Sequence, residues 1–267
     1  MLRSSPLLQT TVSERKQQVK DLLKSIETGD SKPVGFVNPN KYIQHNLAIG
    51  DGLEGFGKVL QQLPKGSAKV HTVRLFGDGE YVFAHTDYHF FGEKVGFDIF
   101  RFEDGRIVEH WDNLTDKTGP NPSGRTQLDG ETEVKDVALT AANKQLVKKF
   151  VTTVLVEQQY DQSATYLQAD GYQQHNSAIG DNLSGLQVAL GALAKAGISM
   201  VYDKVHKVLG EGNFVLVVSE GKFAGQPTAY YDLFRVEGGK IVEHWDVLET
   251  IPPRDKWANQ NGKFAFA

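Results

Sequence analysis

Hydrophobic positions along the chain follow a helical spacing in some segments and a strand-like pattern in others. Apolar residues three or four apart predict helices over residues 13–27, 140–158 and 182–197. We expect Thr140 to be the N-cap of the second of these helices. The segment 71–114 contains short strand-like runs broken by Gly-Asp-Gly and Glu-Asp-Gly, which are typical of hairpin turns. Helices followed by such a meander predict an α+β domain with the helices on one face of a curved sheet.

The chain carries this pattern twice. Lys41–Asp51 and Gly171–Asp181 share eight of eleven residues, and Phe100–Leu114 and Phe234–Leu248 share eleven of fifteen. Because the order and the spacing of the two matches are both kept, we interpret the chain as a duplication of one domain of about 130 residues.

A segment rich in Gly, Pro, Thr and Asp separates the two copies and predicts a surface linker. We expect a first domain over residues 1–119, with an N-terminal extension over about 1–12. The linker would then cover residues 120–138, and the second domain 139–267.

Composition excludes several classes of function. The chain has no cysteine, which excludes disulfides, thiolate catalysis and Cys-ligated zinc. A formal net charge of −4 without a Lys/Arg run argues against a nucleic-acid partner. The N-terminus lacks the apolar core of a signal peptide, and no apolar run approaches the roughly 18 residues of a membrane helix. We therefore expect a soluble, cytoplasmic protein with neither a nucleic-acid nor a membrane partner.

Two motifs resemble those of a known family. Tyr-x-Gln-His-Asn before Ile-Gly-Asp, and Asp-x-Phe-Arg before Ile-Val-Glu-His-Trp-Asp, are similar to motifs of the SnoaL-like polyketide cyclase family, which belongs to the nuclear transport factor two-like superfamily. The resemblance covers both copies. It implies two tandem cone-shaped domains, each with a curved, mostly antiparallel sheet wrapped around N-terminal helices. A pocket would lie between the sheet and the helices of each cone.

The resemblance also implies a chemistry and a mode of packing. Cyclases of this type use an Asp as general acid/base on an enolisable ketone, and they need no cofactor. The partner would be a small hydrophobic or carbonyl-containing molecule. Such cones usually dimerise through their sheets, so we expect the two copies to pack sheet to sheet as a pseudo-dimer, and further homo-oligomers remain open.

The Glu-His-Trp-Asp motif supplies the central candidates. Side chains alternate along a strand, so His110 and Asp112 share one face, while Glu109 and Trp111 share the other. A poised Asp beside a His suits proton abstraction next to a carbonyl, and the alternative is a buried pair that only links strands. We expect the Trp to fill an interface between sheets. Counting both copies, the catalytic candidates are Asp112, His110, Asp246 and His244.

Other polar residues are candidates for ligand binding. The Gln-His-Asn stretch recurs in both copies before a turn, where its side chains could cap a helix or line the pocket mouth. An acid in the core of a strand needs a partner, and the His of the neighbouring strand is the natural one. These candidates are His45, Asn46 and Asp98, with their counterparts His175, Asn176 and Asp232.

His85, Asp87 and His89 share one face of a strand in the first copy only. His85-Thr-Asp87 resembles a basic-x-Asp pair of limonene-epoxide-hydrolase-like relatives, whereas the second copy has Glu220 at the position of Asp87. Two His and one Asp could bind zinc or iron, but the set is not shared between the copies. We treat His85 and Asp87 as catalytic candidates and His89 and Glu220 as ligand-binding candidates, and we expect no metal.

Three functions remain open from the sequence. The leading hypothesis is a cofactor-independent enzyme that moves a proton on a small enolisable carbonyl compound, as an aldol cyclase or an isomerase would. The second is a non-catalytic binding protein for a small hydrophobic ligand. The third is an epoxide-hydrolase-like enzyme.

Overall fold

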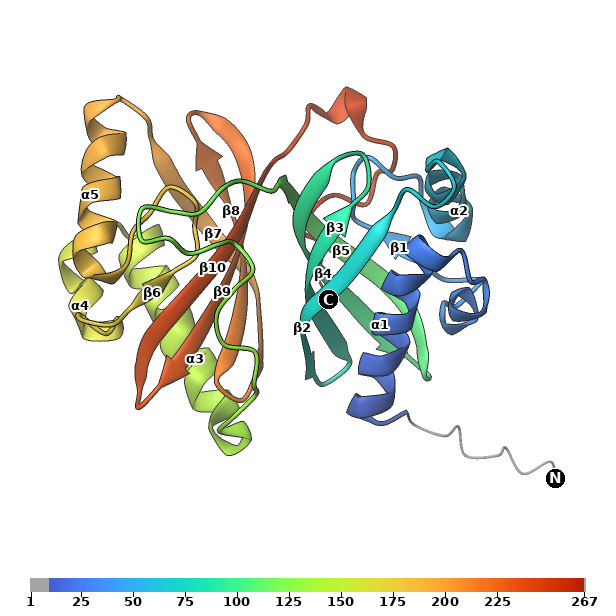
Figure 1. The fold of residues 1–267 in the computed structure, drawn as a ribbon, viewed down its shortest axis with the longest axis horizontal. Coiled ribbons are helices and arrows are strands. Elements are labelled where there is room, and N and C mark those ends of the chain that lie inside the picture. The colour runs from blue at the N-terminus through green and yellow to red at the C-terminus, as the bar shows by residue number, and fades with distance from the viewer. Residues whose placement is uncertain (1–9, 267) are drawn as a thin grey trace.

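The structure, a computed structural model, describes residues 10–266 and contains two α+β halves (Figure 1). The predicted N-terminal extension over about residues 1–12 therefore lies almost entirely outside the described residues. The first half contains α1 (Val12–Thr28), a 3-10 turn (Lys32–Phe36), β1 (Ile43–Gln44), α2 (Gly52–Gln62), β2 (Lys69–Asp78), β3 (Tyr81–His89), β4 (Glu93–Glu103) and β5 (Arg106–Asp116).

The second half repeats this order. It contains α3 (Thr140–Phe150), which continues as a π-helical segment (Val151–Val156), then α4 (Ser163–Tyr166), β6 (Gln173–Gln174), α5 (Asn182–Lys195), β7 (Met200–Glu211), β8 (Phe214–Phe223), β9 (Gln226–Glu237) and β10 (Lys240–Thr250). Short 3-10 turns occupy Val137–Leu139, Tyr160–Gln162 and Arg254–Lys256.

Each half has one five-stranded sheet, ordered β1-β5-β4-β3-β2 in the first and β6-β10-β9-β8-β7 in the second. The short strands β1 and β6 pair in parallel, and all other pairings in the two sheets are antiparallel. The predicted fold class is confirmed: each half combines N-terminal helices with a mostly antiparallel meander.

Turn residues place the hairpins where the sequence predicts them. Asp104 and Gly105 both have positive φ, at 49° and 75°, between β4 and β5. Gly238 and Gly239 repeat this between β9 and β10, at 57° and 75°. Two consecutive positive φ values give the turn type whose twist matches a two-residue hairpin, and Asp-Gly and Gly-Gly tolerate it.

The predicted N-cap of α3 is wrong. Leu139 occupies that position, and Thr140 is the first residue of the helix. A 3-10 turn immediately precedes the helix, so the Thr140 hydroxyl has a different use: it donates to the carbonyl of Val137 and accepts from the amide of Gly212. By contrast, α1 begins with a full capping box between Thr11 and Glu14.

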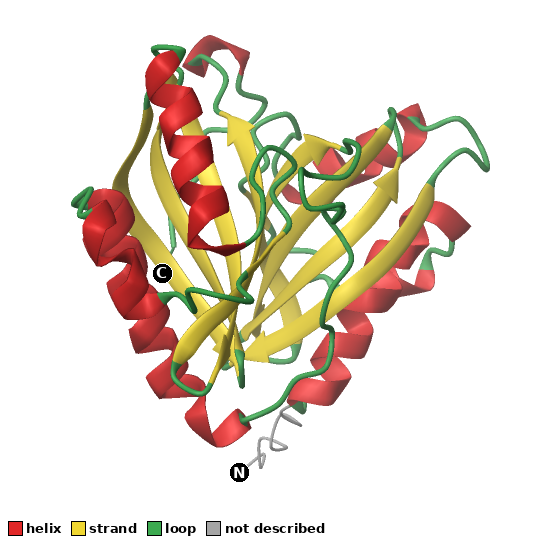
Figure 2. Ribbon diagram, turned by 60° about the vertical axis from the view of Figure 1, so that its left-hand side comes forward, coloured by secondary structure: helices red, strands yellow, loops and turns green. Residues whose placement is uncertain are grey.

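Three apolar cores lie one behind another across the molecule. The first joins α1 to one face of the first sheet, and the third joins α3 and its π-helical continuation to the second sheet. Between them, a central core combines side chains of both sheets, among them Phe97 and Trp111 of the first and Phe214 and Trp245 of the second. Figure 2 shows the resulting order, with the two sheets facing each other and helices outside.

In each half, the segment after the last strand crosses to the other half and bonds to it. Residues 117–136 follow β5 and bond to the second half, where the Asn121 side-chain amide donates to the carbonyls of Gln174 and Ile179. Residues 251–266 follow β10 and bond to the first half, where the Asn259 side-chain amide donates to the carbonyls of Asn46 and Ile49. The linker and the C-terminal tail are therefore structural counterparts (Figure 1).

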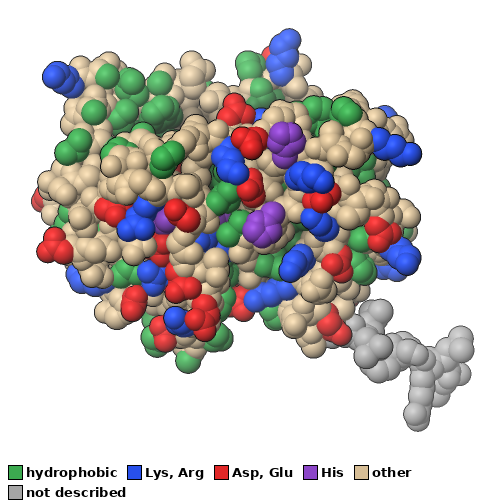
Figure 3. Space-filling model, in the orientation of Figure 1, with side chains coloured by type: hydrophobic (Ala, Val, Ile, Leu, Met, Phe, Trp, Pro, Cys, Tyr) green, Lys and Arg blue, Asp and Glu red, His purple; other side chains and the backbone are tan. Residues whose placement is uncertain are grey.

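The surface and the helices complete the description. On the face shown in Figure 3, acidic and basic side chains are interspersed over both halves. No helix among residues 10–266 is both long enough and apolar enough to cross a membrane.

The central core predicts a large effect of Trp111→Ala on stability. The Trp111 side chain is fully buried, and its indole N–H donates to the carbonyl of Ala265. Removing a buried indole leaves a cavity that costs about 3–5 kcal/mol of unfolding free energy. Urea denaturation measures this loss, and Val188→Ala on α5, where Val188 is 72% exposed, is the matched control. An effect of Trp111→Ala no larger than that of the control would contradict the central core.

Candidate functional site

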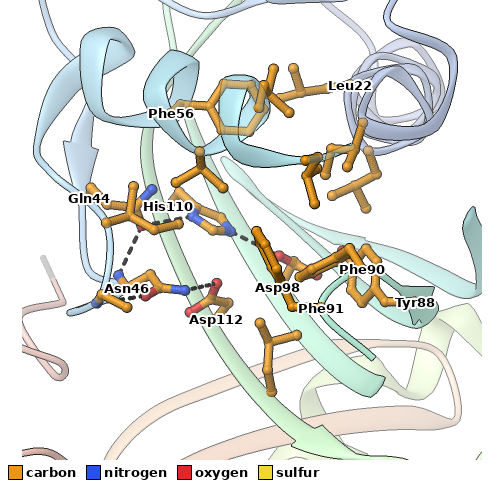
Figure 4. Close-up of a pocket in the computed structure, with 18 of the residues that line it drawn as sticks. Leu22, Gln44, Asn46, Phe56, Tyr88, Phe90, Phe91, Asp98, His110 and Asp112 are labelled. Atoms are coloured by element: carbon orange, nitrogen blue, oxygen red, sulfur yellow. Dashed lines mark hydrogen bonds and ion pairs between the residues drawn. The ribbon is translucent and has the colours of Figure 1, made fainter. Parts of the chain in front are cut away.

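A cavity of about 340 Å³ lies in the first half between the sheet and helices α1 and α2. Figure 4 shows Leu22 and Phe56 on the helical side and Asp98, His110 and Asp112 on the strand side. The apolar lining comes from Leu22, Leu23, Ile26, Ala48, Ile49, Phe56, Val59, Leu60, Leu63, Phe90, Phe91, Phe100 and Leu114. The polar and charged lining comes from Tyr42, Gln44, Asn46, Gln62, Tyr88, Lys94, Asp98, His110 and Asp112. The charged groups of β4 and β5 thus face a mostly apolar space.

Strand register explains why the two acids point the same way. Asp98 of β4 lies directly opposite Asp112 of β5 and Ala84 of β3, so these three residues form one cross-strand row on the cavity face. His110 lies two residues from Asp112 and therefore shares that face. The predicted alternation of the Glu-His-Trp-Asp motif is confirmed, with His110 and Asp112 lining the cavity and Trp111 in the central core.

Hydrogen bonds fix the proton positions on His110. The side-chain oxygen of Gln44 accepts from the backbone N–H of Asn46 at 2.9 Å. The same oxygen lies 2.9 Å from Nδ1 of His110, so Nδ1 must carry a proton and donate it. Nε2 of His110 meets Oδ1 of Asp98 at 2.9 Å. One proton lies between Nε2 and the carboxyl, and the ionic form of this pair is an imidazolium beside a carboxylate.

Tyr88 supports the carboxylate form of Asp98. Its hydroxyl donates to Oδ2 of Asp98 at 2.6 Å. Burial raises the pKa of Tyr88 well above its usual value, and the negative charge of Asp98 raises it further, so the hydroxyl keeps its proton for this bond. Asp98 is thus held from both sides, by Tyr88 and by His110.

Asp112 presents one free carboxylate oxygen. Its Oδ2 accepts from the side-chain amide of Asn46 at 2.7 Å. Its Oδ1 is buried and accepts no hydrogen bond from any residue within 10–266. The nearest cation is Lys263, whose Nζ lies 3.7 Å from Oδ1. This buried oxygen therefore keeps an open lone pair, and the Asp112 side chain lines the apolar cavity.

The second half repeats the network. Gln174 accepts from Nδ1 of His244 at 2.8 Å, and Nε2 of His244 meets Asp232 at 2.8 Å. Asn176 donates to Oδ2 of Asp246 at 2.7 Å, as Asn46 does to Asp112. The Tyr202 hydroxyl donates to Asp232 at 3.1 Å. Two copies of one proton network therefore lie in the molecule, one against each set of helices.

Two pKa shifts describe the second network. Burial alone would lower the pKa of His244, but its hydrogen bond to Asp232 and the charges of both acids raise it above its usual value. Burial raises the pKa of Asp246 to about 6, and the charge of His244 opposes this rise. The imidazole therefore holds its proton to higher pH than a free imidazole does, while Asp246 changes charge near pH 6.

Three sequence candidates lie away from the cavity. His85 pairs across the sheet with Phe97, one residue out of step with the row of Asp98, and so faces the central core. There it stacks on Phe97, and burial together with the Arg74 guanidinium holds its pKa well below the usual value. Asp87 and His89 share the face of His85 and line a separate polar hollow, where Lys117 pairs with Asp87 at 2.9 Å. Alternation along β3 is the physical reason why none of the three meets Asp112.

His45, His175 and Glu220 also face away from the two networks. His45 stacks on Trp111 and bonds to Glu109 at 2.9 Å. His175 does the same with Trp245 and Glu243, at 2.8 Å from the carboxylate. Glu220 pairs with His206 near the surface at 2.7 Å. All three are ligand-binding candidates in the sequence, but their hydrogen-bond and ion-pair partners are side chains of the protein itself.

His45 and His175, which face the central core, both bond to the crossing segments. Nδ1 of His45 lies 2.7 Å from the carbonyl of Gly262, and Nδ1 of His175 lies 2.8 Å from the carbonyl of Thr126. Glu109, which bonds to His45, also receives a hydrogen bond from Arg101 at 2.6 Å. Burial would raise the pKa of Glu109, but the bonds from His45 and Arg101 outweigh it and lower that pKa.

Sequence reasoning missed Gln44 and Tyr88, which complete the network. The signal for Gln44 was available, because alternation along β1 puts Gln44 and Asn46 on one face and His45 on the other. Tyr88 had no such signal, since its bond to Asp98 depends on the pairing of β3 with β4. The cavity-facing candidates are thus Asn46, Asp98, His110 and Asp112, with Asn176, Asp232, His244 and Asp246 as their counterparts.

The same residues raise the question of a metal. Donor atoms of Asp98, His110 and Asp112 lie within 4.8 Å of one another, as do those of Asp232, His244 and Asp246. In the first half the ammonium of Lys263 already lies beside Asp112, and a dication there would meet a like charge. In both halves a tyrosine hydroxyl and an imidazole N–H already satisfy the central acid. We interpret both clusters as proton networks.

Comparison with known proteins gives matches to solved structures only. No family model and no curated protein matches the chain. TsrD from Streptomyces laurentii is 19% identical, with a TM-score of 0.35, and the match covers 40% of this chain and 91% of that one. A SnoaL-like polyketide cyclase from Agrobacterium tumefaciens is 14% identical, with a TM-score of 0.33, and covers 40% and 91%. An NTF2-like protein of unknown function from Cytophaga hutchinsonii is 15% identical, with a TM-score of 0.34, and covers 40% and 92%. Similarity at this level assigns no function to the chain.

The raised pKa of Asp246 predicts a pH-dependent effect of Asp246→Asn on stability. A carboxyl whose pKa is about 6 in the folded state and about 3.9 in the unfolded state destabilises the fold as pH rises through 6. The amide removes this cost, so at pH 8 the variant should be more stable than the parent by about 1–3 kcal/mol. At pH 4 the two should be nearly equal.

Denaturant unfolding at pH 4 and pH 8 measures this difference. Asp170→Asn, at an exposed position, is the control and should change the unfolding free energy by less than about 0.5 kcal/mol at both pH values. A parent as stable as Asp246→Asn at pH 8 would show that the carboxylate is not held in an unfavourable environment.

Proposed function

We propose that the chain is a cofactor-independent enzyme that moves a proton on a small, mostly apolar compound with an enolisable carbonyl group. The observation that carries the proposal is the free Oδ1 of Asp112, buried at the wall of an apolar cavity and oriented through Oδ2 by Asn46. The resemblance of the Glu-His-Trp-Asp motif to SnoaL-like polyketide cyclases supports the same class of reaction.

Asp112 is the general base of the proposal. Its Oδ1 takes a proton from the carbon next to the carbonyl, which breaks the C–H bond and leaves an enolate. In an aldol closure, the enolate carbon forms a bond to a second carbonyl of the same molecule. The resulting alkoxide then takes the proton back from Asp112. In an isomerisation, the proton returns to another carbon, and in neither case is a redox partner needed.

His110 contributes its charge to this reaction. Both of its N–H groups are engaged, with Gln44 and with Asp98, so it has no free donor for the substrate. A fixed imidazolium within 4.8 Å of Asp112 stabilises negative charge that develops on a carbonyl oxygen in a site with little water. Asp98, Gln44 and Tyr88 are positioning residues, because they act through His110.

The cavity walls limit the substrate class. The helical side supplies aliphatic and aromatic side chains, including Leu22 and Phe56. A cavity of about 340 Å³ takes a small organic molecule. As a finer part of the same proposal, the two halves correspond to the subunits of a dimer, with sheets in contact and one site on the outer side of each.

A deuterium-exchange experiment tests the base without knowledge of the natural substrate. Model ketones are incubated in D₂O with the protein, and NMR follows deuterium entering the carbon next to the carbonyl. Asp112→Asn should lower the rate of the first site about 10²–10⁴-fold, since it removes the base but keeps the shape. Asp246→Asn should do the same for the second site, and the double variant should leave only the uncatalysed rate.

Asp87→Asn is the matched control for these variants. Asp87 lies on the opposite face of the first sheet, paired with Lys117, and its substitution should leave the exchange rate unchanged. Equal exchange rates in the parent, both single variants and the double variant would overturn the assignment of a general base.

One observation favours a binding function as the second candidate. Both N–H groups of His110 are satisfied within the protein, so the site can hold an apolar molecule without donating a proton to it. A binding protein would show a ligand-dependent rise in melting temperature that is retained in Asp112→Asn, with no deuterium exchange in the parent. His85 and Asp87, the basic-x-Asp pair that suggested an epoxide hydrolase, do not line the cavity.

A further inference from the structure

The two networks differ where the crossing segments meet them. The carbonyls of Gly262 and Thr126 bond to His45 and His175, and the carbonyls of Ala265 and Asp129 accept from Trp111 and Trp245. Both pairs are 136 residues apart, so the segments correspond residue by residue between these bonds. Lys263 directly follows Gly262, and Gln127 directly follows Thr126. A lysine on the first half therefore takes the place of a glutamine on the second.

Lys263 is built into the first half as a buried charge. Its side chain is 2% exposed, and its Nζ lies 3.7 Å from Oδ1 of Asp112 and 3.0 Å from Oε1 of Glu249. The other oxygen of Glu249 accepts from the backbone N–H of Leu114 at 2.7 Å. Lys263 and Glu249 both belong to the second half of the sequence, so the second half supplies the cation that faces the acid of the first.

Lys263 lies beside the free Oδ1 of Asp112. It is not among the residues that line the cavity, whereas Asp112 is. We therefore assign the effect of the ammonium to the charge of the neighbouring carboxylate. At under 4 Å with little water between them, an opposite charge favours the ionised form of an acid.

The groups around the two acids show how specific this difference is. Asp112 is faced by Asp98, His110, Tyr42, Tyr88, Tyr231, Glu249 and Lys263. Asp246 is faced by Asp232, His244, His175, Tyr172 and Tyr202, with Tyr230 nearby. Each set holds a central acid, an imidazole and tyrosines. Within these two sets the ammonium occurs only beside Asp112.

We propose that Lys263 is a positioning residue that keeps Asp112 ionised, so that the first site works as a base at a lower pH than the second. The role of Asp112 as a base rests on the proposed function, whereas the effect of Lys263 on the ionisation of Asp112 does not depend on it. The second site, with Gln127 in place of the lysine, holds an acid that exchanges its proton near neutral pH. The duplication thus yields two copies of one network with different working ranges, set by a residue that does not line the cavity of the first half.

Reciprocal exchange of the two residues tests the inference. Lys263→Gln gives the first half the residue of the second, and Gln127→Lys gives the second half the residue of the first. The carboxyl carbons of residues 112 and 246 are followed by ¹³C NMR against pH, with assignments from the loss of signals in Asp112→Asn and Asp246→Asn. Lys263→Gln should move the midpoint of the Asp112 signal up by about one unit or more, and Gln127→Lys should move that of Asp246 down.

Two further measurements separate charge from packing and binding from catalysis. Lys263→Arg keeps the charge and should leave the Asp112 midpoint within a few tenths of a unit of the parent value. In the Asp246→Asn background, Lys263→Gln should move the acidic limb of the kcat/KM profile for deuterium exchange to higher pH. If no ketone exchanges, the proposed function fails while the NMR midpoints still decide the inference. Unchanged midpoints in both exchange variants, or an equal shift in Lys263→Arg, would overturn it.

Discussion

The two-residue period of a β-strand is the constraint on which the rest of this molecule depends. The Glu-His-Trp-Asp motif occupies a strand that is buried on both faces, so each of its four side chains must find a partner on its own side. His110 and Asp112 turn to the cavity, while Glu109 and Trp111 turn to the centre. One strand therefore forms a polar face and an interface at the same time, and the second half repeats this with β10.

The face of that strand that turns to the centre accounts for a second motif, which the cavity face does not. Glu109 must be neutralised where it is buried, and Arg101 and His45 do so. His45 then uses its other nitrogen to hold a carbonyl of the crossing tail. Alternation thus divides the repeated Gln-His-Asn stretch between two faces. Its Gln and Asn line the cavity, and its His bonds to the crossing tail.

Much of the fold could be predicted from the sequence, and the part that could not has a physical reason. The repeats, the hairpin turns and the faces of His110 and Asp112 all follow from side-chain identity and period. The crossing of the tails does not, because Gly262, Ala265, Thr126 and Asp129 are bound through backbone carbonyls that any residue supplies. Lys263 had no clear signal either, because the two segments share only Asn-x-x-Gly, at Asn121–Gly124 and Asn259–Gly262.

The three candidates of β3 that lie away from the cavity show the effect of strand register. Alternation within β3 correctly groups His85, Asp87 and His89, but it cannot say which face of the sheet they share. That depends on which residue of β4 lies opposite, and the pairing of Ala84 with Asp98 puts His85 on the far side. A sequence can therefore group residues within a strand, whereas a site that spans strands is decided by a register that only the folded sheet fixes. The same limit hid Tyr88, which reaches Asp98 because of that register.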